Sequence, residues 1–436
     1  MSLETPDRIR ELQKKLHEKA KQEPAYRFYL LYDKVYREDI LEHAWRLVRE
    51  HRGAAGVDGV RIADIEARGA EEWLAGLREE LRGKTYRPDP VRRVLIAKRG
   101  GGQRPLGIPT VRDRVVQSAA KLVLEPIVEA DLEPSAYGYR PGRSARDAVV
   151  AVDEGVRAGY VEVVDADLAK YFDSIPHQEL MQTVARRVSD RHMLRLVKLW
   201  LGAVVEERDE QGGGRHRGGK RNRQGTPQGG VISPLLANWY MNRFLKHWRQ
   251  QDKGEQFCAR LINYADDFVI LSRGYAVAAM EWTRDVMSRL GLSLNPTKTG
   301  IKDSTRERFD FLGHSFGPER NRKTGRRYLA VRPSKRSIIQ IKQRIAGLLR
   351  PANVTPWPQT AVALNRVIRG WANYFSYGLR WKSYRAVDWY VINRVRNFLQ
   401  RRHQVPTRGT RRFSARHIYD ELGVVQLKKL LRTSTA

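Results

Sequence analysis

Two adjacent carboxylates interrupt an otherwise apolar stretch of the chain. The tetrapeptide Tyr264-Ala265-Asp266-Asp267 follows Leu261-Ile262-Asn263 and precedes Phe268-Val269-Ile270-Leu271, a pattern typical of two buried strands joined by a turn. Burying two neighbouring carboxylates is unfavourable unless a cation or strong donors neutralise them, so the pattern favours a metal site. A solvent-exposed turn is the alternative, because Asp tolerates turn geometry and bonds its own backbone. Four residues alone leave both interpretations open.

The charge balance indicates a polyanionic partner. The 436 residues include 81 Lys and Arg against 49 Asp and Glu, a net charge of +32. Because an excess of this size destabilises a compact chain by self-repulsion, we expect the protein to bind nucleic acid. The length allows two or three domains, each with a core of its own.

Other classes of protein are disfavoured by what the sequence lacks. No apolar stretch reaches the roughly 18 to 20 residues that span a bilayer, so no membrane partner is expected. The segment 1–7 carries acidic residues and has no apolar signal-peptide core. The single cysteine, Cys258, excludes an internal disulfide and a cysteine-cluster zinc site. These features predict an intracellular protein.

Periodicity predicts a mixture of helices and strands. Helical patterns cover residues 1–50, 112–128, 176–188 and the segment after Pro234, whereas 160–167 has the pattern of a strand. Residues 91–108 are typical of a hairpin with a glycine-rich tip at 100–102. Residues 207–225 are mostly Gly, Arg, Lys, Asp and Gln, a composition that predicts a mobile loop.

A third carboxylate, Asp167, ends the strand predicted at 160–167, roughly one hundred residues before the Asp266-Asp267 pair. Three carboxylates on neighbouring strands of one sheet would hold two Mg2+ ions, which prefer oxygen ligands. Such an ion pair serves in-line phosphoryl transfer by activating the attacking hydroxyl and stabilising the leaving oxygen. For Asp167 alone, a helix cap is the alternative role.

Eight motifs give the chain a family resemblance. They occur in the order in which bacterial group II intron reverse transcriptases, also called intron-encoded maturases, carry them, and the chain resembles that family from about Ile9 to at least Tyr384. The motifs are Gly56-Val57-Asp58-Gly59, Arg104-Pro105-Leu106-Gly107-Ile108-Pro109, Gly138-Tyr139-Arg140-Pro141-Gly142-Arg143, Asp167-Leu168-Ala169-Lys170-Tyr171-Phe172-Asp173, Gly225-Thr226-Pro227-Gln228-Gly229-Gly230, Tyr264-Ala265-Asp266-Asp267, Leu294-Asn295-Pro296-Thr297-Lys298-Thr299 and Phe311-Leu312-Gly313-His314.

The resemblance implies an α+β right-hand polymerase fold with fingers, an antiparallel palm sheet and a helical thumb. The implied borders are 1–155 for an N-terminal extension and fingers, 156–325 for the palm with a fingers-type insertion at about 185–225, 326–402 for the thumb or maturase domain, and 403–436 for a short basic appendage. Many relatives end in a zinc-supported HNH endonuclease containing cysteine pairs. Because no cysteine follows Cys258, we expect no such nuclease here.

The resemblance also implies the site residues. Asp167, Asp266 and Asp267 would be the catalytic ligands of two Mg2+ ions, for which Mn2+ could substitute. Asp266 is preferred over Asp267 as a direct ligand, because neighbours on an extended segment point to opposite faces. The residues expected to bind the nucleotide are Lys98 and Arg104 at the triphosphate, Phe172 as the ring that excludes a ribose 2'-hydroxyl, and Gln228 at the sugar. The residues expected to contact primer and template are Lys298, Phe311, Leu312, Gly313 and His314.

Plainer roles remain open for some of these residues. Phe172 could be ordinary core packing and His314 a structural histidine. Lys98 and Arg104 could be solvated cations or could contact the phosphate backbone of a nucleic acid.

Residues 331–412 contain 18 Lys and Arg and one acid, Asp388, which places +17 of the total charge there. Nine aromatic residues are interleaved with these cations between Trp357 and Tyr390. The cations would neutralise phosphates, most aromatics would build a helical core, and a few could stack on unpaired bases.

The function implied by the resemblance is RNA-directed DNA synthesis by a bacterial cytoplasmic protein that also binds its intron RNA as a splicing maturase. The expected partners are an RNA template, the intron RNA, a DNA primer or target DNA, and deoxynucleoside triphosphates. Two alternatives are a domesticated reverse transcriptase serving DNA repair or phage defence, and an RNA-binding splicing factor that has lost polymerisation. The three clustered acids argue against the second alternative, because such a factor would have no use for them.

Overall fold

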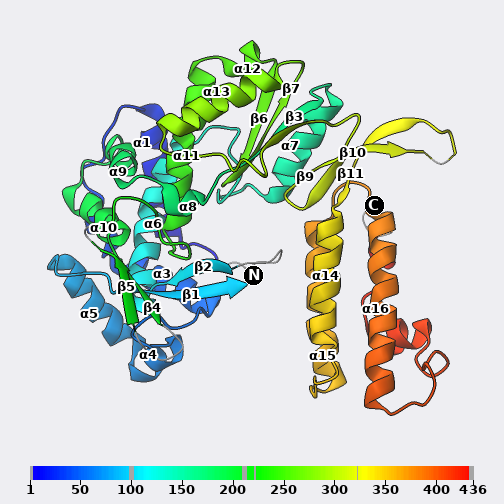
Figure 1. The fold of residues 1–436 in the computed structure, drawn as a ribbon. Helices are drawn as coiled ribbons and strands as arrows, with labels where there is room; N and C mark the ends of the chain where they lie inside the picture. The colour runs from blue at the N-terminus through cyan, green and yellow to red at the C-terminus, as the bar shows by residue number, and fades with distance from the viewer. Residues whose placement is uncertain (1–2, 98–102, 209–213, 220–221, 322, 432–436) are drawn as a thin grey trace.

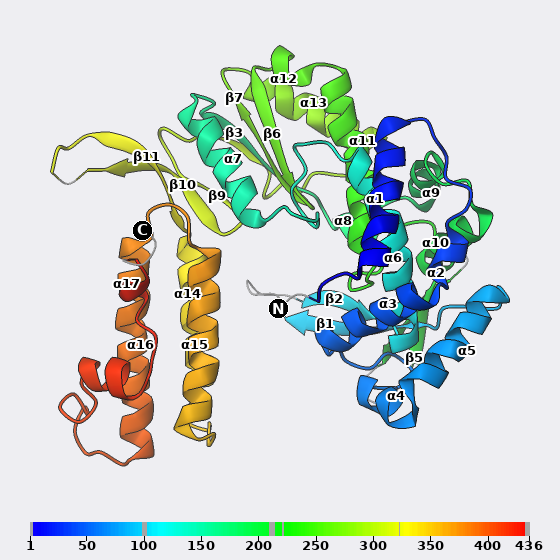
Figure 2. The same cartoon turned by 180° about the vertical axis from the view of Figure 1, so that it is seen from behind.

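The computed structural model describes residues 3–97, 103–208, 214–219, 222–321 and 323–431. Helices and three small sheets make up this part of the chain, which confirms the predicted mixture of helix and sheet (Figure 1). Strands of the first two sheets alternate along the chain, and the third sheet follows them. Three long helices near the C-terminus stand apart from the N-terminal helices (Figures 1 and 2).

The N-terminal half is built around one buried helix, α6 (Val111–Asp131). Apolar residues occupy nearly all sides of α6, so other helices cover it on several faces. Thr110 caps the helix by accepting a hydrogen bond from the Asp113 amide at 3.2 Å. Helices α1 (Asp7–Gln22), α2 (Tyr32–Val35) and α3 (Glu38–His51) contact α6, whereas α5 (Ala70–Arg82) packs against α3 and α4 (Ile62–Arg68).

The buried side chain of Arg187 connects the N-terminal segment to the end of α6. Arg187 is 4% exposed, and its Nε lies 3.1 Å from Asp131 Oδ2 at the end of α6. Its other nitrogens donate to four backbone carbonyls that follow or end α1, those of Ala20, Glu23, Pro24 and Tyr26. The guanidinium therefore satisfies carbonyls that a helix end leaves without partners.

The first sheet has the strand order β2-β1-β4-β5. Its bounds are β1 (Val91–Ala97), β2 (Gln103–Ile108), β4 (Val204–Arg208) and β5 (Gly214–Gly218). The antiparallel β1–β2 pair confirms the predicted hairpin at 91–108, and β4 joins β1 in parallel. The prediction of a mobile loop at 207–225 was wrong for residues 207–208, which end β4, and for 214–218, which pair with β4 as an antiparallel strand despite their Gly and Arg content. This strand forms through backbone hydrogen bonds to β4 and does not depend on hydrophobic side chains.

The second sheet is antiparallel throughout and has the order β6-β7-β3-β8. Its bounds are β3 (Glu162–Asp167), β6 (Ala259–Tyr264), β7 (Asp267–Ser272) and β8 (Gly300–Asp303). Val163 and Val269 pack on the side of α7 (Ala145–Arg157), whereas Val164 and Ile270 belong to the main core beside α13 (Ala276–Arg289). Both faces are buried, which explains the nearly unbroken apolar runs in the sequence.

Helices α8 (Tyr171–Ser174), α9 (His177–Ala185), α10 (Arg191–Leu201), α11 (Ser233–Gln250) and α12 (Lys253–Gln256) complete the main body. A third sheet of order β11-β10-β9 follows it, formed by β9 (Phe309–Phe311), β10 (His314–Arg320) and β11 (Arg327–Pro333). The stacked rings of Phe309 and Phe316, 5.0 Å apart, join β9 and β10.

The C-terminal helices have a core of their own. They are α14 (Lys335–Leu348), α15 (Trp357–Tyr374) and α16 (Trp381–Arg402), followed by a π-helical turn, η1 (His417–Glu421), and α17 (Leu427–Leu430). Ile341, Leu364 and Val391 are buried between the three long helices. Four residues of the predicted basic appendage enter the same core, namely Phe413, Ile418, Val424 and Leu427. The segment after α16 therefore packs as part of this helical unit.

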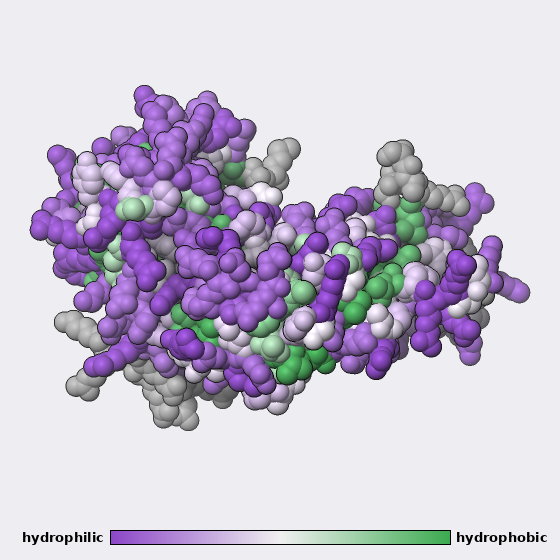
Figure 3. All heavy atoms as spheres, turned by 90° about the horizontal axis from the view of Figure 1, so that it is seen from above, coloured by the Kyte–Doolittle hydropathy of each residue, from purple (hydrophilic) through white to green (hydrophobic). Residues whose placement is uncertain are grey.

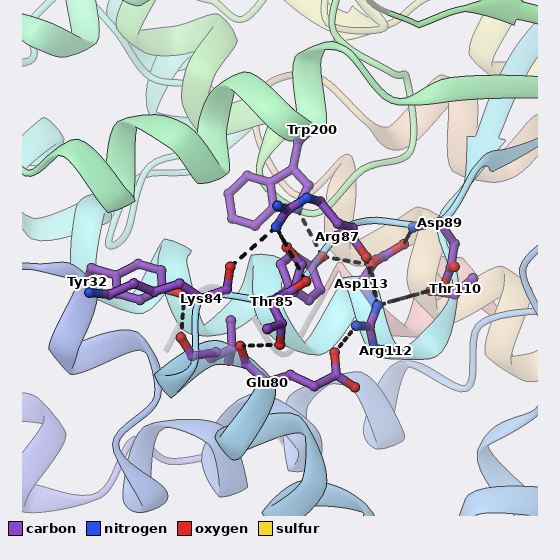
Figure 4. A network of polar contacts seen from close by, with 12 residues as sticks. Tyr32, Glu80, Lys84, Thr85, Arg87, Asp89, Thr110, Arg112, Asp113 and Trp200 are labelled. Carbon is purple, nitrogen blue, oxygen red and sulfur yellow. Dashed lines mark hydrogen bonds and ion pairs between the residues drawn. The ribbon is translucent and has the colours of Figure 1, made fainter.

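A polar network ties α6 to α10 and to the segment after α5 (Figure 4). The Tyr86 hydroxyl donates to Asp113 Oδ1 at 2.6 Å and accepts from Trp200 Nε1 at 3.2 Å. Burial raises the pKa of Asp113 to about 6, although the hydrogen bond from Tyr86 opposes the shift. Arg112, beside Asp113, pairs with Glu80.

The surface of the described residues is mostly hydrophilic on the face shown in Figure 3, where hydrophobic residues gather in a narrower band. Across the described ranges, no helix is both long and apolar enough to cross a membrane.

Candidate active site

The predicted carboxylates meet at one end of the second sheet. In the β3–β7 ladder, Asp167 lies directly opposite Asp267, and in the β6–β7 hairpin Asp267 pairs with Tyr264. Ala265 and Asp266 therefore form the two-residue turn, with Ala265 at a φ of 58°. The structure thus brings all three acids together, with Asp167 and Asp267 as ladder partners and Asp266 at the tip of the turn.

Close backbone packing fixes the position of this turn. A Cβ atom on Gly138 would lie 2.6 Å from the Ala265 nitrogen, so the Gly138 motif approaches the turn as only glycine can. Asn263 Nδ2 donates to the Ala265 carbonyl at 2.9 Å, and Asn238 Nδ2 donates to the Gly138 carbonyl at 2.5 Å. These contacts hold Asp266 on a rigid support.

The segment 294–299 holds Asp167 from the other side. Lys298 Nζ lies 2.9 Å from Asp167 Oδ2, and Asn295 Nδ2 donates to the same oxygen at 3.2 Å. The Asn295 amide also donates to the Asp167 carbonyl at 2.7 Å. The Lys298 side chain is 63% exposed, so its ammonium remains accessible to an anionic substrate. Lys298 lies beside the predicted catalytic acids.

Negative charge is crowded around Asp267. Its side chain reaches solvent, yet protein atoms surround the carboxyl, and burial together with the charges of Asp266, Asp167 and Asp165 raises its pKa to about 7. Lys298 opposes the shift. Crowded carboxylates of this kind attract cations.

The donor chemistry fits a hard divalent cation. Carboxylate oxygens are the ligands that Mg2+ and Mn2+ prefer, and the three acids come from rigid strands and a tight turn. Within the described ranges, no three His, Cys, Asp or Glu side chains already converge as a preformed ligand set. In this arrangement Lys298 supplies the positive charge at Asp167.

The glycine-rich loop 225–230 lies between α8 and the first sheet. Thr226 donates its amide hydrogen to the Phe172 carbonyl at 2.7 Å, and Gly107 donates to the Gln228 carbonyl at 2.5 Å. At Gly229, with a φ of 109°, a Cβ atom would lie 2.3 Å from the Gly107 carbonyl oxygen. A cavity of about 210 Å³ adjoins the loop, and its lining includes Arg93, Pro105, Asp173 and Gln228.

The other residues predicted to bind the nucleotide are Phe172, Arg104 and Lys98. Phe172 is 5% exposed and packs in the main core, with its ring 5.8 Å from that of Tyr171. Arg104 lies in β2 opposite Ile96, with its backbone paired in the hairpin. Lys98 lies outside the described residues.

The segment Phe311–His314 joins the sheets to the C-terminal helices. Gly313, at a φ of 75°, accepts hydrogen bonds from the Ser334 amide at 2.9 Å and the Ser337 hydroxyl at 2.8 Å. The Tyr374 hydroxyl donates to the Leu312 carbonyl at 3.0 Å. These bonds fix the segment against α14 and α15.

His314 is held inside this junction. It is 1% exposed, and burial lowers its pKa to about 4, so the ring is neutral near pH 7. Nδ1 lies 3.2 Å from the Leu312 carbonyl, and the Phe375 ring is 4.8 Å away. The buried position favours the structural alternative for His314 over direct contact with nucleic acid.

Two further residues of the site escaped the sequence prediction. Asp165 lies two positions before Asp167 on β3 and pairs with Lys302 of β8 at 2.9 Å. The alternation of side chains along a strand could have placed Asp165 on the face of Asp167. Asn295 lies within a motif that the sequence does reveal, but its bond to Asp167 depends on the fold.

Comparison with known families divides the chain in two. Residues 96–316 match the model of the reverse transcriptase (RNA-dependent DNA polymerase) family. Residues 338–417 match the group II intron, maturase-specific domain. The first match runs from the end of β1 to the start of β10 and includes the whole second sheet with the clustered acids, and the second covers most of α14 and all of α15 and α16.

Similar proteins include Protein YkfC of Escherichia coli, 35% identical over 367 residues, which cover 76% of this chain and 93% of YkfC. The group II intron-encoded protein LtrA of Lactococcus lactis is 34% identical over 221 residues, covering 50% of this chain and 35% of LtrA. An uncharacterised 91 kDa protein in the cob intron of Schizosaccharomyces pombe is 26% identical over 372 residues, covering 69% of this chain and 45% of that protein. The chain thus spans nearly all of YkfC but less than half of the other two.

Proposed function

This chain belongs to the reverse transcriptase (RNA-dependent DNA polymerase) family and carries a group II intron maturase-specific domain, and we propose that it copies RNA into DNA at the carboxylates of the second sheet. The observation that carries the proposal is the register of β3 and β7, which sets Asp167 opposite Asp267 beside the turn residue Asp266. Loop 225–230 contacts Phe172, which follows Asp167 by five residues, and Lys298 pairs with Asp167 itself.

Reverse transcriptases require divalent metal ions, and we assign Asp167, Asp266 and Asp267 as the residues that would hold two Mg2+ ions. Bound ions would activate the attacking primer hydroxyl and stabilise the leaving pyrophosphate oxygen. Two side chains nearby would act before any chemistry. Asn295 would orient the Asp167 carboxylate, and the Lys298 ammonium would attract a phosphate of the primer or template.

The fold supports the division of the chain into fingers, palm and thumb. The first sheet would be the fingers, because β1 and β2 carry Arg104 and β4 joins them from an insertion between α10 and α11. The second sheet would be the palm, and α14 to α16 the thumb. Tyr374 and Ser337 bond the Leu312-Gly313 segment, so the thumb would position the primer end directly.

The maturase match supports a second role in binding intron RNA. The proposed partners are an RNA template, the intron RNA, a DNA primer or target DNA, and deoxynucleoside triphosphates. The positive stretch 331–412 supplies the electrostatic attraction, which will weaken as salt rises.

Extension of a DNA primer annealed to an RNA template tests the polymerase proposal. We expect extension with deoxynucleotides, its arrest by a chelator, and its recovery when Mg2+ or Mn2+ is added in excess of the chelator. A protein that binds the annealed substrate but never extends it contradicts the proposal and favours an RNA-binding splicing factor.

Phe172 would exclude ribonucleotides, although the ring is also part of the core. We expect Phe172→Ala to raise incorporation of ribonucleotides relative to deoxynucleotides, because the smaller side chain leaves room for a 2'-hydroxyl. Truncation of a buried Phe also costs about 3–5 kcal/mol of stability. The measurement is the ratio of kcat/KM for the two nucleotide classes.

A matched control separates the two effects of Phe172→Ala. Phe244 is fully buried on α11, and Phe244→Ala should lower stability to a similar extent without changing nucleotide discrimination. Unchanged discrimination in Phe172→Ala would assign Phe172 to core packing alone.

A further inference from the structure

Two tryptophans lie open to solvent on one side of α16. Trp381 is 51% exposed and Trp389 is 68% exposed, although side chains of this size are usually largely buried. Arg385 lies between them in the sequence, and its guanidinium carbon is 5.5 Å from the centre of the Trp381 ring. Residues four apart share one side of a helix, so the three side chains form a row, which we call the Trp–Arg–Trp row.

The other aromatic residues of the helical unit have structural partners. Phe375 and Tyr384 are buried, and the Tyr374 hydroxyl bonds the Leu312 carbonyl. Trp357, Trp371 and Tyr390 are partly buried against the helical core. The rings of Trp381 and Trp389 differ because neither belongs to that core. A packing role does not account for them.

The row stands in a positive environment. The only acid on α16, Asp388, is 6% exposed and accepts hydrogen bonds from the Leu427 and Lys428 amides at 2.8 and 3.0 Å. The other charged residues of this helix are all basic, namely Lys382, Arg385, Arg394, Arg396, Arg401 and Arg402. Glu319 of β10 pairs with Lys382, at one end of the row. Exposed indoles among cations suit a ligand that offers both aromatic faces and negative charge.

The Trp389 end of the row lies opposite the packed side of α16. Val387 and Val391 of α16 are buried against the helical core. Trp389 is two residues from each of them, about 200° around the helix. In Figures 1 and 2, α14 and α15 stand between α16 and the N-terminal half of the molecule. A ligand stacked on Trp389 would therefore lie outside the space between the thumb and the fingers.

We propose that the Trp–Arg–Trp row is a stacking surface for unpaired bases of RNA, separate from the carboxylate site. Every base has a flat face that an indole or guanidinium can cover, and stacking of this kind tolerates any sequence. The cations along α16 would neutralise the phosphates between the stacked bases. A duplex does not fit, because its bases are already stacked and paired inside the helix. The choice of RNA as the partner rests on the proposed function.

The test uses the full chain with its primer–template site saturated by an unlabelled, chain-terminated RNA–DNA duplex. Binding of a labelled, unstructured RNA and of a blunt RNA duplex of equal length is then measured by fluorescence anisotropy at fixed salt. Trp381→Ala and Trp389→Ala should each weaken binding of the unstructured RNA by about 5- to 150-fold, and the duplex much less. The slope of log affinity against log salt should stay the same, because no charge is lost.

Three controls make the result decisive. Replacement of both tryptophans by Phe should keep most of the affinity, because a phenyl ring still stacks. Tyr275→Ala removes an equally exposed ring, 51%, at the start of α13 and should change nothing. Primer extension on a pre-annealed substrate should be unchanged in the double Ala variant. Failure of the parent to extend would therefore count against the proposed polymerase function and not against the stacking surface.

Several outcomes would overturn the stacking proposal. The proposal is wrong if the double Ala variant binds unstructured RNA with unchanged affinity. It is also wrong if the affinities for duplex and unstructured RNA fall equally. Loss of extension together with RNA binding would assign the row to the primer–template site. If sedimentation shows a dimer of the parent that the double variant cannot form, with RNA binding intact, the row is an interface between copies of the chain.

Discussion

Asp167→Asn and Asp266→Asn should each lower the rate of primer extension by about 10³-fold or more, since loss of a proposed metal ligand would remove several kcal/mol of transition-state stabilisation. Asn keeps the size of Asp but loses its charge. In Asp167→Asn, the Lys298 ammonium also loses the carboxylate that lies 2.9 Å from it. The measurement is single-turnover extension on a pre-annealed RNA–DNA substrate at saturating nucleotide.

The same variants should fold normally. Each removes one of the negative charges that raise the pKa of Asp267, so the thermal midpoint should be unchanged or slightly higher. Asp303→Asn is the matched control, because Asp303 lies in the same sheet, opposite Glu162 at the far end of β3 from Asp167. Asp303→Asn should extend primers at nearly the parent rate. Near-parent extension by Asp167→Asn would remove that residue from the catalytic site.

Arg187→Met should lower the free energy of unfolding by about 3–5 kcal/mol, because it leaves the buried Asp131 carboxylate without its positive partner. Asp131 is 12% exposed at its side chain and pairs with Arg187, and burial already raises its pKa. The variant also removes the donor to the four carbonyls near the end of α1. The urea midpoint measures the loss, and proteolysis should cut first between α1 and α2.

Arg46→Met provides the comparison for this loss. Arg46 pairs with Glu42 at 3.2 Å, and both side chains are 47% exposed, so solvent screens the pair. We expect a change of about 1 kcal/mol or less. Equal effects of the two substitutions would mean that Arg187 holds the N-terminal segment no more tightly than a surface ion pair.

The sequence predicted the local elements of the site well. The hairpin at 91–108, the helix at 112–128 and the strand ending at Asp167 each carry a clear hydrophobic period, and each matches an element of the structure. Asp266 and Asp267 could be placed on a hairpin for the same reason. The order of the motifs then predicted the family, which the comparisons confirm.

Features that depend on long-range contacts could not be predicted in this way. Strand β5 pairs through its backbone, and its Gly- and Arg-rich sequence lacks the apolar alternation that predicts a strand. The choice between Asp266 and Asp267 rested on alternation along one strand, whereas the ladder partner of Asp167 is set by the register between two strands. Nor does composition distinguish Tyr384 in the core from Trp389 on the surface, because that difference depends on which helices pack together.

The anchoring of the N-terminal segment by Arg187 also has a consequence during synthesis on the ribosome. The carbonyls of residues 20–26 emerge long before Arg187, which follows Pro24 by well over one hundred residues. At about 5–20 residues per second, α1 waits roughly 10 to 30 s for this partner. During that interval the apolar side of α1 is only partly covered, so chaperones should bind the nascent chain most strongly at α1. This binding should end as α9 emerges.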